Sequence, residues 1–288
     1  MSWKSASGSV RDGYVRLTDD LTLHYQTAGR GGTVIIFVPG WTMTTKSFER
    51  QLEFFRNSDQ YTVLTYDPRA QGLSSVTMDG HYYEQRARDL KAFVKALNIP
   101  SFVLVGWSSG GADILEYLRL YGSEGVLAFT LLEAWPKSRS YDMDDDWVPF
   151  GTKDNGDQND FFKSFVLDVV TDRAAATHAA ASWILGGNPT EEALDMVINM
   201  SRCTPDSIAA LLNATYWFLD NTTDLEKIDG KVPLLYYTRA EQELLARKWA
   251  QKHTPSAKVI SHGGHMMFWD EHERFNEQFI GFLRSVGL

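Results

Sequence analysis

The sequence contains little cysteine and no long apolar segment. Its 288 residues include one cysteine, Cys203, so an intramolecular disulfide cannot form, and we expect Cys203 to be a small buried residue. No apolar run is long enough to span a bilayer, and residues 1–5 lack the apolar stretch of a signal peptide. The sequence therefore favours a cytoplasmic protein whose fold does not depend on an oxidising compartment.

Basic residues are fewer than acidic ones. Lys and Arg number 28 against 37 Asp and Glu, which gives a formal net charge of -9. Because nucleic acids and anionic membranes repel such a chain, neither is expected as a partner. The hydrophobic share of 43% and the charged share of 23% are ordinary for a soluble globular protein. A neutral or apolar small molecule is the expected ligand, and a homodimer is left open.

Short apolar runs alternate with helical segments at both ends of the chain. Two segments of alternating polarity, residues 13–18 and 22–27, fit half-buried strands. Continuous apolar runs, typical of strands covered on both faces, occupy residues 34–38, 61–66, 102–105, 126–132, 232–237 and 257–261. Helices are expected over residues 45–55, 82–97, 109–121, 240–252 and 270–285. This order predicts an α/β fold with a mostly parallel, eight-stranded sheet and helices on both faces.

The alternation breaks between residues 136 and 230, where no buried strand run occurs. An acidic stretch at residues 142–146 opens this region. Helical segments follow over residues 160–185, 190–201 and 205–219. We predict that residues 136–230 form a helical cap, inserted into a core made of residues 1–135 and 231–288.

The strongest motif is Gly106-Trp107-Ser108-Ser109-Gly110, a Gly-x-Ser-x-Gly sequence between an apolar strand and a helix. Small residues let the chain turn sharply there, so that Ser108 projects above the sheet at a helix N-terminus. The motif therefore indicates Ser108 as a nucleophile. The alternative is a Gly/Ser-rich turn without chemistry.

A serine hydroxyl needs a general base, and His265 is the best candidate. It follows the strand predicted at residues 257–261, in a loop that returns over the nucleophile. His262 is a second histidine in this loop, but it lies at the strand end and is expected to be structural.

Glu133 is the best candidate for the acid that orients His265. It ends the strand predicted at residues 126–132, where burying an ionised group is costly without a specific reason. Orienting a catalytic imidazole is such a reason. Glu241 and Glu243 are the alternatives. Both lie in the first turn of a predicted helix, where acidic residues are favoured in any case.

Two backbone N–H groups, those of Ser109 and Trp41, are predicted to bind an oxyanion. Gly40 permits the sharp turn before Trp41. The predicted substrate contacts are Gly40, Trp107, Trp135, Trp183 and Met266, which would form an apolar, aromatic pocket. Alternatively, Trp107 packs beneath the nucleophile and does not contact the substrate. The other cap aromatics either line the pocket or pack between helices: Trp147, Phe161, Phe162 and Trp217.

Four segments together resemble the α/β-hydrolase superfamily: residues 38–42, 66–74, 105–111 and 264–276. In that family an aspartate usually follows the strand at residues 233–238, and it is missing here. The chain also resembles zearalenone-type lactonases, and this resemblance implies a set of Ser108, Glu133 and His265. A Pro-Gly-Trp loop is similar to that of cofactor-free quinolone dioxygenases, which carry a histidine where this chain has Met43. Non-haem haloperoxidases look similar too and imply the same esterase machinery.

These observations predict a serine hydrolase that cleaves a bulky, largely apolar ester or lactone through an acyl-enzyme at Ser108. No metal and no organic cofactor is expected. One alternative is cofactor-free oxygenation with His265 as the base. Another is a ligand receptor built on a hydrolase fold.

Overall fold

One eight-stranded sheet forms the centre of the molecule. The computed structural model describes residues 8–140, 147–149, 160, 163–186 and 189–288. The strand order is β1-β2-β4-β3-β5-β6-β7-β8. The β1–β2 and β2–β4 pairs are antiparallel, and the remaining pairs are parallel. The predicted α/β class with a mostly parallel, eight-stranded sheet is confirmed.

The strands lie close to where the apolar runs predict them. They are β1 (Arg11–Arg16), β2 (Thr22–Gly29), β3 (Thr33–Val38), β4 (Tyr61–Tyr66), β5 (Phe102–Trp107), β6 (Val126–Leu132), β7 (Leu234–Thr238) and β8 (Lys258–Ser261). β1 ends earlier than predicted because the turn to β2 already begins at Leu17. There the N–H of Leu17 donates to the carbonyl of Leu21 at 2.8 Å.

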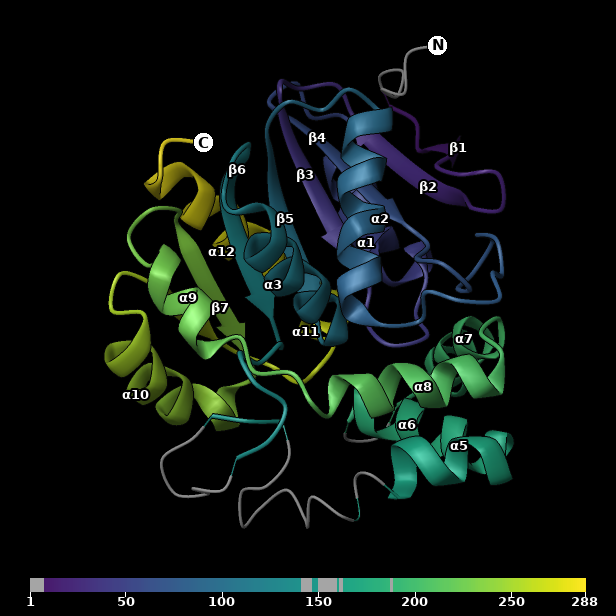
Figure 1. The fold of residues 1–288 in the computed structure, drawn as a ribbon. Helices are drawn as coiled ribbons and strands as arrows, with labels where there is room; N and C mark the ends of the chain where they lie inside the picture. Colours follow the sequence, from purple (N-terminus) through teal and green to yellow (C-terminus); the bar gives the residue numbers. More distant parts are fainter. Residues whose placement is uncertain (1–7, 141–146, 150–159, 161–162, 187–188) are drawn as a thin grey trace.

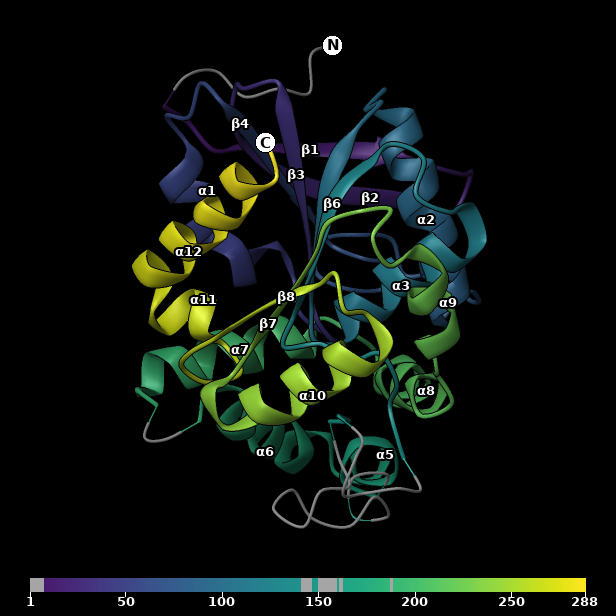
Figure 2. The same cartoon turned by 90° about the vertical axis from the view of Figure 1, so that its left-hand side faces the viewer.

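Helices cover both faces of the sheet, as the alternation predicts (Figures 1 and 2). One face carries α2 (Tyr83–Ala96), α3 (Ser109–Tyr121), α9 (Thr222–Ile228) and α10 (Glu243–His253), which share a hydrophobic cluster with it. The other face carries α1 (Glu49–Phe55), α11 (Met267–Asp270) and α12 (His272–Ser285). Short 3-10 turns, η1 (Thr45–Phe48) and η3 (Ala240–Gln242), precede α1 and α10.

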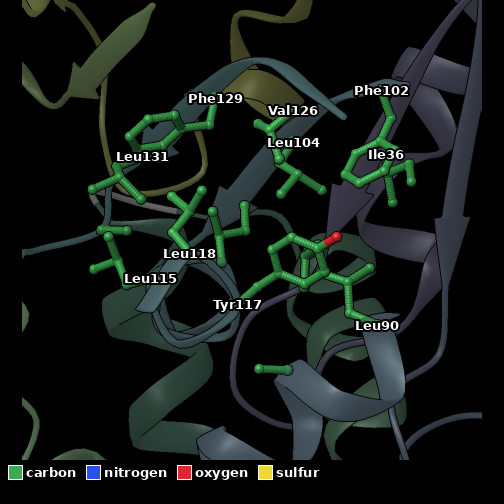
Figure 3. Close-up of a cluster of buried hydrophobic side chains, with 14 of the residues drawn as sticks. Ile36, Leu90, Phe102, Leu104, Leu115, Tyr117, Leu118, Val126, Phe129 and Leu131 are labelled. Carbon is green, nitrogen blue, oxygen red and sulfur yellow. The ribbon is translucent and has the colours of Figure 1, made fainter. Parts of the chain in front are cut away.

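The core between α3 and the sheet buries one of the two faces that the apolar strands present. Figure 3 shows Leu115, Tyr117 and Leu118 of α3 beside side chains of β5 and β6, and all three are buried. Leu104 of β5 is completely buried among them. Each such side chain contributes about 1.5–3 kcal/mol by leaving water. This packing holds the sheet against the helix that begins at the Ser108 turn.

The segment between β6 and β7 contains a set of helices at the carboxyl ends of the strands (Figure 1). They are a π-helical turn η2 (Lys163–Leu167), α5 (Asp168–Thr171), α6 (Arg173–Leu185), α7 (Glu191–Arg202) and α8 (Asp206–Tyr216), before α9. The helix expected over residues 160–185 is interrupted at Asp172, whose side chain caps α6 by accepting from the N–H of Ala175. The acidic stretch 142–146, Phe161 and Phe162 lie outside the described residues. No helix in the described ranges is both long and apolar enough to cross a membrane.

Cys203 is exposed, so the expectation that it is buried is wrong. The buried residues of α7 are Val197, Met200 and Ser201. Cys203 follows Ser201 by two positions, which turns its side chain by about 200° to the opposite face of the helix. Its Sγ donates to the Asn199 carbonyl at 3.5 Å.

The buried core predicts a large loss of stability for Leu104→Ala. This change removes a completely buried side chain and leaves a cavity, so the free energy of unfolding should fall by about 2–5 kcal/mol. Urea unfolding measures it. Leu244→Ala on α10 is the matched control, because Leu244 is 80% exposed and its loss should change stability by less than about 0.5 kcal/mol. Equal effects of the two changes would contradict the assigned core.

Candidate active site

The turn between β5 and α3 is built by glycines around a strained serine. Ser108 has a φ of 53° and a ψ of -125°, a conformation that costs a non-glycine residue about 1–3 kcal/mol. A Cβ on Gly106 would lie 2.5 Å from the Gly110 carbonyl oxygen, and one on Gly110 would lie 2.3 Å from the Val38 carbonyl oxygen. Side chains at either position would therefore open the turn. The motif is placed between a strand and a helix, the context that gives it meaning.

A second tight turn, residues 40–43, lies against Ser108. A Cβ on Gly40 would approach the Cβ of Ser108 to 3.2 Å, so glycine permits this contact. The N–H of Met43 donates to the Gly40 carbonyl at 3.2 Å, and Thr42 adopts a positive φ of 56°. The indole of Trp41 donates to the Ala209 carbonyl of α8 at 2.8 Å. The turn that carries the predicted oxyanion donor is thus fixed both to the Ser108 turn and to α8.

His265 and Glu133 are in direct contact. Nδ1 of His265 donates to Oε2 of Glu133 at 2.9 Å, and both side chains are buried. The contact fixes the tautomer of His265, because an ionised carboxylate can only accept. Nε2 of the imidazole is then the nitrogen that can take up a proton.

The other carboxylate oxygen of Glu133 is held by the chain that follows β7. Thr238 donates its hydroxyl to Oε1 at 2.8 Å, and the N–H of Arg239 donates at 2.7 Å. The Arg239 guanidinium lies 3.6 Å from Oε2. Glu133 also has a positive φ of 45°. These partners satisfy a carboxylate that would otherwise be costly to bury. The sequence gives no signal that Thr238 and Arg239 belong to the site.

The surroundings set the protonation of the Glu133–His265 pair. Burial raises the pKa of Glu133, but the hydrogen bond from His265 and the charge of Arg239 outweigh it, so the pKa falls below its ordinary value. Burial lowers the pKa of His265 more than the Glu133 carboxylate raises it. At neutral pH the pair is therefore a carboxylate beside a neutral imidazole, which can accept a proton.

Three tryptophans surround His265 and account for its burial. The ring of Trp183 from α6 lies 4.5 Å from the imidazole between ring centroids, Trp107 lies at 5.6 Å, and Trp135 stacks at 6.0 Å. The indole of Trp107 also donates to the His265 carbonyl at 3.0 Å. Both alternatives for Trp107 therefore apply, since it packs beside the turn and also lines the cavity.

The alternative candidates for the acid and the base do not contact the Glu133–His265 pair. Glu241 has an 85% exposed side chain and pairs with Arg239, while Glu243 bonds to Ser261 and Arg247. Neither forms a hydrogen bond or an ion pair with His265. His262 contacts the Tyr237 hydroxyl at 2.8 Å, which fits the structural role expected of it.

Ser108 and His265 line one cavity of about 50 Å³. Six predicted residues line it with them: Gly40, Trp41, Trp107, Ser109, Trp135 and Trp183. The other described lining residues were not predicted: Met43, Pro149, Phe165, Ile184, Asn213 and Tyr216. No hydrogen bond joins Ser108 to His265; such contacts often tighten only when substrate binds.

Met266 and two of the cap tryptophans lie away from the cavity. Met266 is completely buried in the hydrophobic cluster that contains Phe268 and Phe275, so its predicted substrate contact is not seen. It stands at the N-cap of α11, where the chain turns from the site into the core. Trp147 donates its indole N–H to Gln242 at 2.9 Å, and Trp217 is buried outside the cavity lining.

A family model matches about half of this chain, and related proteins match nearly all of it. A family model described as "alpha/beta hydrolase fold" matches residues 33–182. A bifunctional esterase/perhydrolase from Acinetobacter calcoaceticus is 26% identical over 284 residues, which cover 95% of this chain and 100% of the relative. A bromoperoxidase structure from Bacillus anthracis has a TM-score of 0.82 at 20% identity, covering 95% of this chain and 100% of that one. An esterase structure from Exiguobacterium antarcticum has a TM-score of 0.81 at 20% identity, covering 94% and 98%. These structural likenesses show the fold.

The burial of His265 predicts that its imidazole titrates below the ordinary value of 6.5. Glu133→Gln should move this pKa lower still, because it removes the anion that favours the protonated ring. Nitrogen NMR of the imidazole across the acidic range measures both. Glu243→Gln is the control and should leave the titration unchanged. A midpoint above 6.5 in the unmodified chain would contradict the argument.

Proposed function

We propose that this chain, which belongs to the α/β-hydrolase family, is a serine hydrolase that cleaves a carboxylic ester or lactone. The observation that carries the proposal is the buried hydrogen bond that Glu133 accepts from His265, a histidine that lines the same cavity as Ser108. A strained serine, a neutral imidazole and an orienting carboxylate are the groups needed for nucleophilic acyl transfer.

The proposed first step is attack by Ser108. Its Oγ forms a bond to the ester carbonyl carbon while Nε2 of His265 takes the hydroxyl proton. The carbonyl π electrons move to oxygen and form an oxyanion. Glu133 stabilises the imidazolium at that moment, because its carboxylate already accepts from Nδ1.

The oxyanion would be bound by backbone N–H groups of Trp41 and Ser109. Ser109 is the first residue of α3, so its N–H belongs to the unpaired first turn of a helix. Trp41 follows the glycine that lies against Ser108. Donors fixed before the reaction stabilise the developing charge without reorganising.

Collapse of the tetrahedral intermediate breaks the ester C–O bond, and the leaving alkoxide takes the proton from His265. In a lactone the alcohol stays attached to the acyl chain. Water, deprotonated by His265, then attacks the acyl-enzyme, and Ser108 leaves with the proton. Every step is a proton transfer or acyl transfer carried by residues of this chain.

The cavity favours a neutral, apolar substrate. Among the described residues that line it, none is Lys, Arg, Asp or Glu, and tryptophans form much of the wall. A volume of about 50 Å³ is small, since pockets for drug-sized ligands commonly have volumes of roughly 300–1,000 Å³. A bulky ester would therefore require the cap side of the wall, which includes Trp183 of α6 and Tyr216 of α8, to move outward.

Loss of the nucleophile tests the proposal directly. Ser108→Ala should abolish labelling by a fluorophosphonate and reduce ester and lactone hydrolysis by several orders of magnitude, because the acyl-enzyme cannot form. A mass-spectrometric map of the labelled residue and a screen of aryl esters and lactones measure this. Labelling at another serine would refute the assignment, and substrate-dependent oxygen consumption would favour cofactor-free oxygenation instead.

Glu133→Gln separates the orienting role from folding. The amide can present its NH₂ group to Nδ1 and stabilise the wrong tautomer, so turnover should fall by roughly 10²–10⁴-fold while the protein still folds. Steady-state kinetics and circular dichroism measure the two effects. Glu241→Gln is the matched control on an exposed carboxylate, and it should retain nearly full activity. Near-normal turnover by Glu133→Gln would contradict the proposed acid.

A further inference from the structure

A buried polar network connects the turn at residues 40–43 to helix α3. Its members are Gln71 in the loop after β4, Arg86 on α2 and Asp113 on α3, and all three side chains are buried. Buried charged and amide groups are costly unless their bonds are well made. We call these three residues the anchor network.

Gln71 binds two backbone carbonyls of the turn at residues 40–43. Its Nε2 donates to the Met43 carbonyl at 2.5 Å and to the Gly40 carbonyl at 3.3 Å. The Gly40 carbonyl and the Trp41 N–H belong to one peptide unit, which is planar and trans, so they point in opposite directions. A side chain that binds this carbonyl therefore fixes the direction of the Trp41 N–H.

Arg86 determines which way the amide of Gln71 faces. Its Nη1 donates to Oε1 of Gln71 at 2.9 Å, and a guanidinium can only donate. The amide oxygen must therefore face Arg86, and the amide nitrogen must face the turn. Nη2 of Arg86 donates to Asp113 at 2.7 Å. Asp113 lies in the helix whose first residue, Ser109, carries the second proposed oxyanion donor.

From this geometry we propose that Gln71, oriented by the Arg86–Asp113 pair, is a positioning residue that aims the Trp41 N–H at the oxyanion. The inference rests on the serine-hydrolase function proposed above. Gln71 is absent from the described residues that line the cavity, so it acts through the peptide and not on the substrate. Because the oxyanion exists in the transition state and not in the bound ester, a misaimed N–H lowers kcat and leaves KM nearly unchanged.

Gln71→Met is the main test, because methionine has a similar size and donates no hydrogen bond. For an aryl ester, kcat should fall by about 10- to 100-fold, approaching the loss of a whole oxyanion donor, with KM within about twofold. Gln71→Glu keeps an acceptor for Arg86 but cannot donate to the two carbonyls. Its kcat should fall at least as far.

Thr62→Val is the matched control. Thr62 is a buried residue of β4, and its hydroxyl donates to the carbonyl of Gly31 at 2.7 Å. Gly31 lies in the loop before β3, and neither residue lines the cavity. The control should lower the unfolding temperature but preserve kcat. A boronic acid that forms a tetrahedral adduct with Ser108 supplies a second readout. Its affinity for Gln71→Met should fall in parallel with kcat, whereas affinity for the product alcohol should not change.

The outcomes separate this inference from the proposed function. If the unmodified chain hydrolyses esters through Ser108 but Gln71→Met keeps its kcat or changes only KM, the inference is overturned and the function stands. If neither Gln71 variant folds, Gln71 is structural and the inference is likewise overturned. Absence of any Ser108-dependent hydrolysis in the unmodified chain overturns both.

Discussion

The parallel arrangement of the strands is the constraint on which the rest of the site depends. Because parallel strands end at one edge of the sheet, the residues after β3, β5 and β6 emerge side by side (Figure 1). Each of the three loops that follow these strands contains a residue with a positive φ: Thr42, Ser108 and Glu133. None is glycine, so each costs strain that the surrounding packing must hold. The strained residues therefore lie where the chain leaves β3, β5 and β6, at the same edge of the sheet as the cavity.

Buried charge at this edge is tolerated because every charged group has partners from other segments. The family usually carries its acid after β7; here that loop carries Arg239 and supplies donors to Glu133 instead. The proposed acid, Glu133, therefore follows β6, and the groups that support it follow β7. Arg86 and Asp113 form a second buried pair, and Arg86 donates to Gln71, which contacts the turn at residues 40–43. Each pair fixes the orientation of a neighbouring side chain, His265 in the first case and Gln71 in the second.

The strands could be predicted from the sequence because their signal, apolar runs and alternating segments, is local. Ser108 and Glu133 directly follow β5 and β6, and His265 lies in the loop after β8, so the sheet topology brings them to one edge, while their catalytic roles stay a prediction. Sequence reasoning failed where position depends on packing between distant segments. Met266 is adjacent to His265, but the chain turns into α11 between them and directs the methionine into the core. Gln71 looks like an ordinary loop residue in the sequence, because its partners come from the turn after β3 and from α2 and share no sequence pattern.

The helices between β6 and β7 contribute to the cavity in a different way from the sheet edge. The groups proposed for the chemistry belong to the sheet edge, whereas Phe165, Trp183, Ile184, Asn213 and Tyr216 enter from η2, α6 and α8. Trp183 of α6 connects these helices to the sheet edge, since its ring lies against His265. Its ring helps to bury the imidazole, and burial lowers the pKa of His265, so a residue that lines the cavity also influences this pKa. A substitution that widens the cavity at Trp183 should hydrate His265 and raise its pKa. Under the proposed hydrolase function, the range of esters accepted and the pH dependence of turnover would therefore be coupled through this one side chain.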